Sequence, residues 1–200
     1  MDIDSMTPQE QYDYIKEKLS DRYWRLTSGA LYKIKNKEGK IIPFIPNEPQ
    51  KRLIKGLTNR NVVLKSRQVG FSTLIDIMAL DHAMFNKNAN VGVIADTQKN
   101  AKTLFNEKIK LALANLPDRL RVEFDERDKD TFDEIKLPNG SIISVGTSFR
   151  GGTVNFLHIS EYGKICAKYP EKGEEILTGA IEAVPLSGLL FIESTAEGAY

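Results

Sequence analysis

Residues 62–79 constrain the fold most strongly, because a glycine-containing loop joins an apolar strand-like run to a helix-like pattern. The run Val62-Val63-Leu64 precedes the loop, and apolar residues recur at helical spacing after it. A glycine lets the backbone approach a ligand closely, and amides at a helix N-terminus favour a bound anion. The layout predicts a phosphate-binding loop for a nucleoside triphosphate. Its residues are Lys65, Ser66, Arg67, Gln68, Val69, Gly70, Phe71, Ser72 and Thr73.

This loop departs from the pattern G-x-x-x-x-G-K-S/T at two positions. Lys65 stands where the first glycine belongs and Phe71 where the phosphate-binding lysine belongs, whereas Gly70 and Ser72 fall in register. We expect the long side chain of Lys65 to reach phosphate from its displaced position, with Arg67 as a second cation. The alternatives are a surface lysine at a strand end and an arginine that bonds neighbouring carbonyls.

A second motif, Phe156-Leu157-His158-Ile159-Ser160-Glu161, is an apolar strand that ends in a carboxylate, the form of a Walker B strand. Such strands commonly end in two acids, of which the first holds Mg²⁺ and the second orients or deprotonates the attacking water. Here Ser160 replaces the first acid, and Glu161 is the candidate base. The hydroxyls of Ser72 or Thr73 and of Ser160 are the candidate Mg²⁺ ligands. The alternative for Glu161 is a solvated surface charge.

The remaining patterns predict an α/β fold. Thr7-Pro8-Gln9-Glu10 is a capping box that opens a helix to about Leu19, and two short strand-like runs flank a turn at residues 36–39. A later helix is predicted to end near Leu116-Pro117, and Asn139-Gly140 is predicted to close a hairpin. Strands that alternate with helices imply a mostly parallel sheet, with the site at its carboxyl edge. Further strands are predicted at residues 91–95, 135–137, 142–145, 154–160 and 189–193.

Composition narrows the class of protein further. The chain has 200 residues, of which 41% are hydrophobic, and a net charge of +1, which argues neither for nor against nucleic acid. We expect an N-terminal appendage at residues 1–46 and a core at 47–200. The single cysteine, Cys166, excludes an internal disulfide and a cysteine-based zinc cluster. No apolar stretch approaches the roughly 20 residues that span a bilayer, so no membrane partner is expected, and the single cysteine fits a reducing cytosol.

From about Glu48 to Gly198 the chain resembles the ATPase domain of the large terminase subunit, the DNA-packaging motor of tailed bacteriophages and related viruses. Its most specific piece is Ser66-Arg67-Gln68-Val69-Gly70, and the ending Glu193-Ser194-Thr195-Ala196-Glu197-Gly198 resembles the family's coupling motif. The resemblance implies a P-loop NTPase of the additional-strand (ASCE) type, with a small helical and hairpin appendage at the N-terminus. It also implies ATP and Mg²⁺ as cofactors.

Several residue roles follow only from this resemblance. Gln50 matches an adenine-reading glutamine, although a polar residue at a helix start is the alternative. Arg150 matches an arginine finger that acts within its own chain or across a ring interface, although contact with DNA phosphate is the alternative. Ser194, Thr195 and Ala196 match the residues that relay hydrolysis to DNA movement.

The implied activity is a motor that drives double-stranded DNA into a procapsid. The implied partners are double-stranded DNA, the portal protein, the small terminase subunit and further copies of the chain in a ring, with a monomer as the alternative for the isolated chain. The implied location is the host cytoplasm, in a packaging complex that is not part of the mature virion. Large terminases usually continue into an RNase H-like nuclease, and the chain stops at Tyr200, so no nuclease activity is expected.

Two other interpretations stay open. A non-catalytic assembly module would keep the fold without the chemistry, and Phe71 and Ser160 support it. Another ASCE ATPase, such as a superfamily 2 helicase fragment, would share the loop. Against it, Ser160-Glu161-Tyr162-Gly163 stands where an Asp-Glu-x-Asp/His box belongs. Nucleotide binding separates the module from both enzymes, and translocation versus strand separation distinguishes the enzymes.

Overall fold

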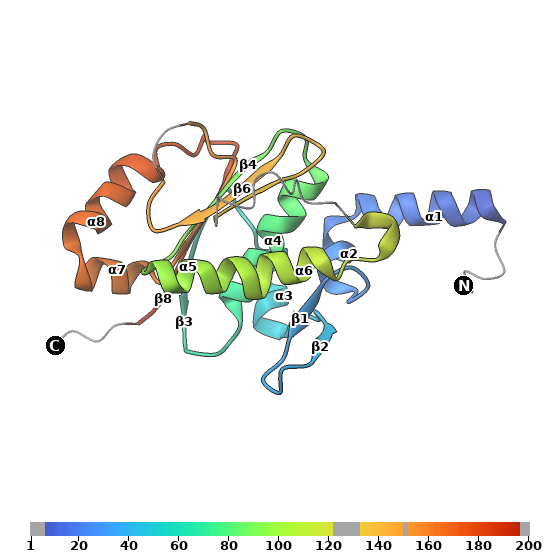
Figure 1. Ribbon diagram of the computed structural model, residues 1–200, viewed down its shortest axis with the longest axis horizontal. Helices are drawn as coiled ribbons and strands as arrows, with labels where there is room; N and C mark the ends of the chain where they lie inside the picture. The colour runs from blue at the N-terminus through green and yellow to red at the C-terminus, as the bar shows by residue number, and fades with distance from the viewer. Residues whose placement is uncertain (1–6, 122–132, 150–151, 197–200) are drawn as a thin grey trace.

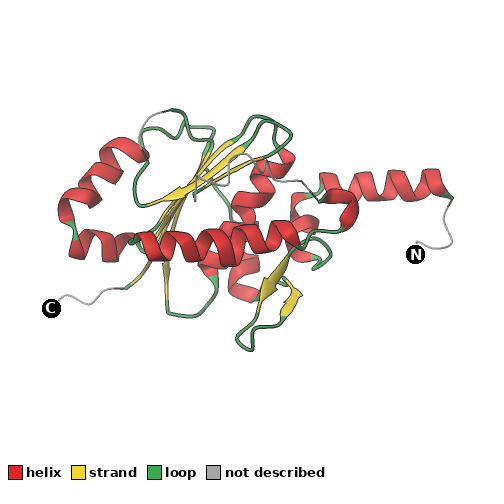
Figure 2. Ribbon diagram, viewed as in Figure 1, coloured by secondary structure: helices red, strands yellow, loops and turns green. Residues whose placement is uncertain are grey.

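A computed structural model describes residues 7–121, 133–149 and 152–196, and its centre is a six-stranded sheet with helices on both faces (Figures 1 and 2). Within this sheet, all neighbouring strands run parallel except the last pair, which is antiparallel. This confirms the predicted mostly parallel α/β sheet. In spatial order the strands are β3 (Arg60–Lys65), β8 (Leu189–Thr195), β7 (Phe156–Ser160), β4 (Asn90–Ile94), β6 (Ile142–Gly146) and β5 (Glu134–Lys136).

The position of strand β8 determines which side chains lie beside the predicted phosphate-binding loop. The strand comes last in the chain but inserts between β3 and β7, which is the additional-strand arrangement. Its register places Thr195 beside Lys65 and Glu193 beside Ser160. The carboxyl ends of the three strands therefore meet at one edge of the sheet.

One face of the sheet is covered by α4 (Phe71–Phe85) and by the continuous helical segment α5 (Gln98–Leu104), η2 (Phe105–Lys110) and α6 (Leu111–Ala114). Helix α4 is apolar nearly all round, as expected for a buried helix. The other face is covered by α7 (Tyr162–Lys168), α8 (Pro170–Glu175) and the π-helical turn η5 (Ile176–Ala180). Side chains alternate along a strand, so Phe156 of β7 faces α4 whereas Leu157 and Ile159 face α7. His158 and Ser160 share the face of Phe156.

The N-terminal segment contains α1 (Pro8–Ser20), α2 (Arg22–Thr27), the hairpin β1 (Lys33–Lys35) and β2 (Ile41–Pro43), and then α3 (Glu48–Lys55). The predicted capping box between Thr7 and Glu10 is present, and α1 extends away from the body (Figure 1). Leu26, Tyr32 and Phe44 pack in the same core as α4. Much of the predicted appendage is therefore held against the sheet by a shared core.

Two local predictions near the far end of the sheet have different outcomes. The hairpin of β5 and β6 is confirmed, and Gly140 in its turn has a φ of 82°. The helix predicted to end near Leu116-Pro117 ends at Ala114, and a 3₁₀ turn, η3 (Asp118–Leu120), follows Pro117. None of the helices that the structure describes is long and apolar enough to cross a membrane.

Candidate active site

The predicted loop connects the end of β3 to the start of α4. Gln68 and Gly70 have φ angles of 66° and 82°, in the left-handed region. A Cβ atom at Gly70 would lie 3.0 Å from Gln50 Nε2, so a side chain there is disfavoured by both conformation and space. No side chain caps the start of α4. The amides of its first turn are therefore oriented for an anion.

Gln50, in the first turn of α3, fixes the position of this loop. Its Oε1 accepts a hydrogen bond of 2.9 Å from the Asn47 amide, and its Nε2 donates one of 2.7 Å to the Gly70 carbonyl. Asn47 also donates through Nδ2 to the Val69 carbonyl. Both ends of the Gln50 amide are thus engaged within the chain. Its reading of adenine stays a prediction, and it would require these bonds to be exchanged for bonds to the base.

Lys65 lies inside the site, with 8% of its side chain exposed. Its Nζ is 3.0 Å from Glu161 Oε1, 3.1 Å from Glu193 Oε2 and 3.2 Å from Ser72 Oγ. Burial acts to lower the pKa of Lys65, but the two carboxylates outweigh it and raise the pKa. The ammonium is therefore charged and joins the loop to the ends of β7 and β8.

Glu161 follows the last residue of β7 and has a φ of 57°. A non-glycine residue in this region costs about 1–3 kcal/mol, and such strain is concentrated at functional sites. Its Oε2 accepts hydrogen bonds from the Thr195 hydroxyl at 2.9 Å and the Thr195 amide at 3.3 Å. Burial acts to raise the pKa of Glu161, but Lys65 and Thr195 outweigh it and lower the pKa. An ionised carboxylate is thus oriented from two sides.

Glu193 is a site residue that the sequence interpretation did not select. Its side chain is fully buried, and its Oε1 accepts hydrogen bonds from the Ser72 hydroxyl at 2.6 Å and the Ser160 hydroxyl at 2.7 Å. Burial acts to raise the pKa of Glu193, but His158 and these hydroxyls lower it well below its ordinary value. The available signal was an acid near the end of an apolar strand, two residues after the core residue Phe191.

Behind Glu193 lies a buried pair that sequence reasoning also missed. His158 Nδ1 is 2.9 Å from Asp76 Oδ1, and His158 Nε2 is 3.5 Å from Glu193 Oε1, an ion-pair distance longer than a good hydrogen bond. Burial acts to lower the pKa of His158, but Asp76 and Glu193 raise it to about 9. Lys108 of η2 lies 3.6 Å from Asp76 Oδ2. A chain of charges therefore connects η2 to the site.

The other predicted loop residues surround this centre. Ser66 and Arg67 are exposed, so the guanidinium is accessible to a ligand. Gln68 accepts a hydrogen bond of 3.2 Å from Lys37, in the turn of the β1–β2 hairpin. Thr73 is half-buried in the first turn of α4.

The predicted coupling residues Ser194 and Thr195 end β8, and Ala196 follows it. Ser194 accepts a hydrogen bond of 3.1 Å from the Gly163 amide in α7, whereas Thr195 contacts Glu161. Ala196 is exposed. Arg150 lies outside the described residues.

The oxygens at this edge of the sheet suit a divalent cation. Magnesium prefers hydroxyl, carboxylate and phosphate oxygens. Ser72 and Ser160 both donate to one oxygen of Glu193, while the other oxygen is buried and lies 3.1 Å from the Lys65 ammonium. In the described part of the chain, no group of three His, Cys, Asp or Glu side chains could hold a metal. A cation here would therefore take ligands from a bound phosphate as well.

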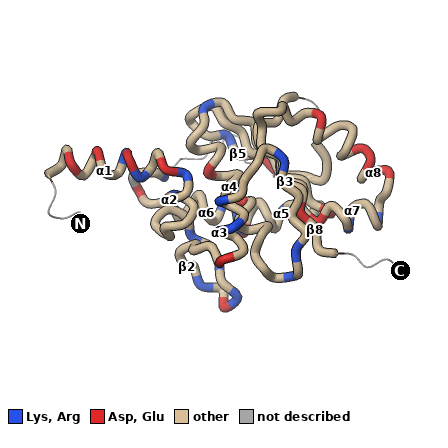
Figure 3. Tube along the Cα trace, turned by 180° about the vertical axis from the view of Figure 1, so that it is seen from behind, with Lys and Arg blue, Asp and Glu red and all other residues tan. Residues whose placement is uncertain are grey.

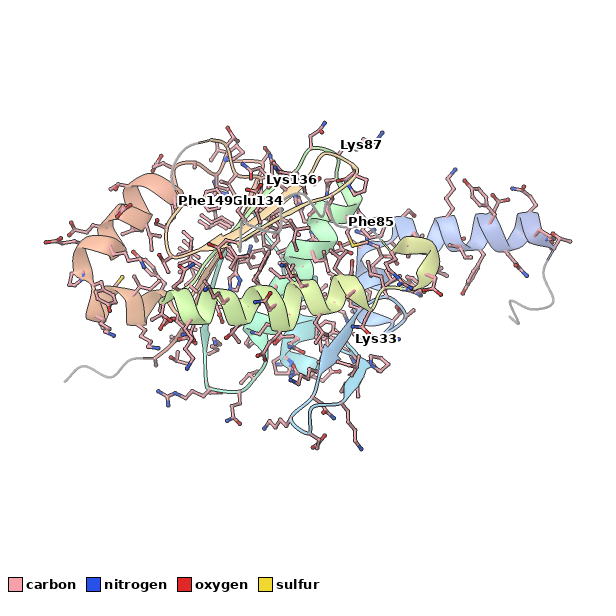
Figure 4. All side chains as sticks on the ribbon, in the orientation of Figure 1. Lys33, Phe85, Lys87, Glu134, Lys136 and Phe149 are labelled. Carbon is pink, nitrogen blue, oxygen red and sulfur yellow. The ribbon has the colours of Figure 1, made fainter. Side chains whose placement is uncertain are left out.

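Away from the site, charged residues of both signs are spread along the chain (Figure 3). Figure 3 shows basic and acidic residues interspersed along most elements, with acidic residues gathered on α8. In Figure 4, Lys87 and Lys136 lie at the edge of the sheet opposite the loop. These two lysines are therefore remote from the site.

Comparisons with known proteins give one kind of match. No family model matches the chain. No curated protein matches it either. Among solved structures, the large terminase ATPase domain of Thermus phage P74-26 matches with a TM-score of 0.55 and 19% identity, over 78% of this chain and 67% of that chain. A variant of that domain with one arginine changed to alanine matches with a TM-score of 0.54 and 20% identity, over 78% of this chain and 68% of that chain. The chain therefore has the fold of a large terminase ATPase domain, as its loop motif predicted.

Proposed function

We propose that this chain is the ATP-hydrolysing motor domain of a viral large terminase subunit, which moves double-stranded DNA into a procapsid. The observation that carries the proposal is the convergence of Lys65, Ser72 and Glu161 beside the uncapped start of α4. The loop of residues 65–73 supplies the cation and the hydroxyl, and the end of β7, distant in sequence, supplies the carboxylate at the carboxyl edge of the same sheet. This is the set of groups that phosphoryl transfer to water requires.

Phosphate binding falls to the loop and to α4. The first-turn amides of α4 and the Lys65 ammonium neutralise the phosphate oxygens, and the exposed Arg67 adds a planar donor. In the structure Lys65 is paired with two carboxylates, so phosphate has to compete with them for the ammonium. Phosphate binding is therefore linked to the release of Lys65 from the two carboxylates.

Water activation falls to Glu161. Its carboxylate orients the attacking water and accepts a proton from it, while Thr195 fixes the position of the carboxylate. Magnesium, held in part by the Ser72 and Ser160 hydroxyls, would neutralise charge that develops on the phosphate oxygens. Ser194, which precedes Thr195 in β8, accepts a hydrogen bond from the Gly163 amide in α7. A change at Glu161 and Thr195 during hydrolysis can therefore be transmitted to α7.

The wider assembly is part of the same proposal and rests on the shared fold. The partners are double-stranded DNA, the portal protein, the small terminase subunit and further copies of this chain in a ring. Arg150 is proposed as the arginine finger, and the packaging complex is proposed to work in the host cytoplasm. The pairing of Lys65 with two carboxylates also fits an assembly module that binds no nucleotide.

Phosphate release from Mg²⁺-ATP, with and without double-stranded DNA, tests the proposal. Glu161→Gln is expected to lower the rate by about 10²- to 10⁴-fold while nucleotide binding is retained, because the variant loses the base but keeps the fold. Glu171→Gln, on exposed surface in α8, is the matched control and is expected to match the unmodified chain. Equal turnover in Glu161→Gln would contradict the assignment of the base.

A further inference from the structure

Strand β7 lacks an acid that this chemistry calls for. In P-loop NTPases the cation is held by the loop hydroxyl and by a carboxylate at the end of the Walker B strand. At the corresponding end of β7 stands Ser160, whose neutral hydroxyl is a weaker ligand for a divalent cation than a carboxylate. Glu161 is directed instead toward Thr195 and Lys65.

Strand β8 places a carboxylate at this position. Glu193 is the register partner of Ser160, on the α4 side of the sheet. It is hydrogen-bonded to Ser160 and to Ser72, the loop hydroxyl that the proposed cation would use. Its charge is fully buried, which is costly unless the charge has a function or is well compensated.

At one oxygen of Glu193 the compensation depends on Lys65. Oε1 of Glu193 accepts two hydrogen bonds, whereas Oε2 is paired, among the described residues, with the Lys65 ammonium at 3.1 Å. Phosphate binding as proposed would draw that ammonium away. Among the described residues, His158, 3.5 Å from Oε1, would then be the remaining cationic neighbour of the carboxylate, and Oε2 would have lost its ion-pair partner.

We infer that Glu193 is the metal-side carboxylate of this site, supplied by the inserted strand in place of the acid that β7 lacks. The inference rests on the proposed nucleotide site. It takes a divalent cation of the Mg²⁺ class, bound together with the phosphates. Glu193 and Glu161 then divide the two acidic roles, with Glu193 on the cation and Glu161 on the water. Lys65 and the cation alternate as partners of Glu193.

Calorimetry with a non-hydrolysable ATP analogue, in Mn²⁺ and in EDTA, tests the inference. The measured quantity is the gain, which is the ratio of the nucleotide affinity in Mn²⁺ to that in EDTA. Glu193→Gln keeps the shape of the side chain and an acceptor for the two hydroxyls but removes the charge. We expect it to reduce the Mn²⁺-dependent gain at least about 10-fold, with little loss of affinity in EDTA. Glu171→Gln is the control and should retain the full gain.

A purely structural role for Glu193 gives a different pattern, because it would change both affinities together and leave their ratio unaltered. That result would overturn the inference. Adding Ser160→Asp to Glu193→Gln is expected to restore the gain, since it returns a carboxylate to the same strand pair. Failure of the double variant to restore the gain would also count against the inference.

A second variant and the unmodified chain distinguish a folding defect from failure of the inference. If Glu193→Gln does not fold, as judged by circular dichroism, Glu193→Asp retains the charge but withdraws the carboxylate by one methylene. It should show a reduced gain, and an undiminished gain overturns the inference. If the unmodified chain binds no analogue in either buffer, the proposed function and the inference fail together. If it shows the gain and Glu193→Gln shows the same gain, the inference alone fails.

Discussion

Ser160 and Glu193 lie opposite each other on neighbouring strands, and the Ser160 hydroxyl donates a 2.7 Å hydrogen bond to the Glu193 carboxylate. The acidic groups of the site are therefore divided between two strands. Glu161 comes from the end of β7 and Glu193 from β8, and Lys65 contacts both. Taken alone, neither strand end contains the pair of acids that marks a Walker B motif.

The hydroxyl of Thr195 is predicted to matter for turnover but not for binding. It holds Glu161 Oε2 at 2.9 Å, and a hydrogen bond to a charged group contributes about 1.5–3 kcal/mol. Thr195→Val is therefore expected to lower the rate of ATP hydrolysis about 10- to 100-fold with ATP affinity unchanged. Thr195→Ser, which keeps the hydroxyl, should remain within a few-fold of the unmodified rate. Equal rates for the two variants would show that the hydroxyl does not position the base.

Gln50 is predicted to support nucleotide binding by holding the loop in position, without contacting the base. Gln50→Ala leaves the Asn47 amide and the Gly70 carbonyl without their partner, so affinities for ATP and GTP should fall by the same factor. Competition calorimetry with both nucleotides measures this, with Gln9→Ala in the exposed first turn of α1 as the control. A loss confined to ATP would instead establish the adenine reading that the family resemblance implies.

The shifted pKa values of the two histidines predict that the folded chain is most stable near pH 6.5. Burial, with repulsion from Arg22, lowers the pKa of His82 to about 4 although Asp81 acts in the opposite direction. Below pH 6.5, His82 therefore takes up a proton in the unfolded chain but remains neutral in the folded chain. The free energy of unfolding falls as pH drops from 6.5 towards 4. The pKa of His158 is raised to about 9, so its contribution is complete below pH 6.5 and is lost as pH rises through 9.

Melting temperatures across this range check both limbs. His82→Gln is expected to flatten the decline between pH 6.5 and 5, where few carboxylates titrate, and to leave the alkaline limb intact. His158→Gln should flatten the alkaline limb. Unchanged slopes in both variants would mean that neither histidine contributes to the pH dependence.

Local elements could be predicted because their signals are local. The run Val91-Gly92-Val93-Ile94-Ala95 predicted a buried strand, and β4 covers most of it. The capping box at Thr7 and the positive φ of Gly140 also follow from neighbouring residues. The loop between β3 and α4 belongs to the same class, which is why its glycine and hydroxyl were found.

Spatial neighbours across the sheet could not be predicted in the same way. Nothing in the pattern around Glu193 states that β8 inserts between β3 and β7, and that insertion alone brings Glu193 to Ser160. The contact of Gln50 with Gly70 and that of His158 with Asp76 likewise join segments far apart in sequence. The family resemblance implied an additional strand in the sheet, but the partner of each side chain follows from the order and register of the strands.

A calorimetric titration with Mg²⁺-ATP of the unmodified chain, Lys65→Ala and Lys87→Ala tests most directly whether the loop of residues 65–73 binds nucleotide. Lys87 lies at the opposite edge of the sheet and serves as the matched control (Figure 4). We expect saturable binding that Lys65→Ala weakens about 10- to 100-fold and Lys87→Ala leaves unchanged, as expected for one charge-assisted hydrogen bond to phosphate. Absence of binding by the unmodified chain, or equal binding by Lys65→Ala, would contradict the claim that this loop is a nucleotide site.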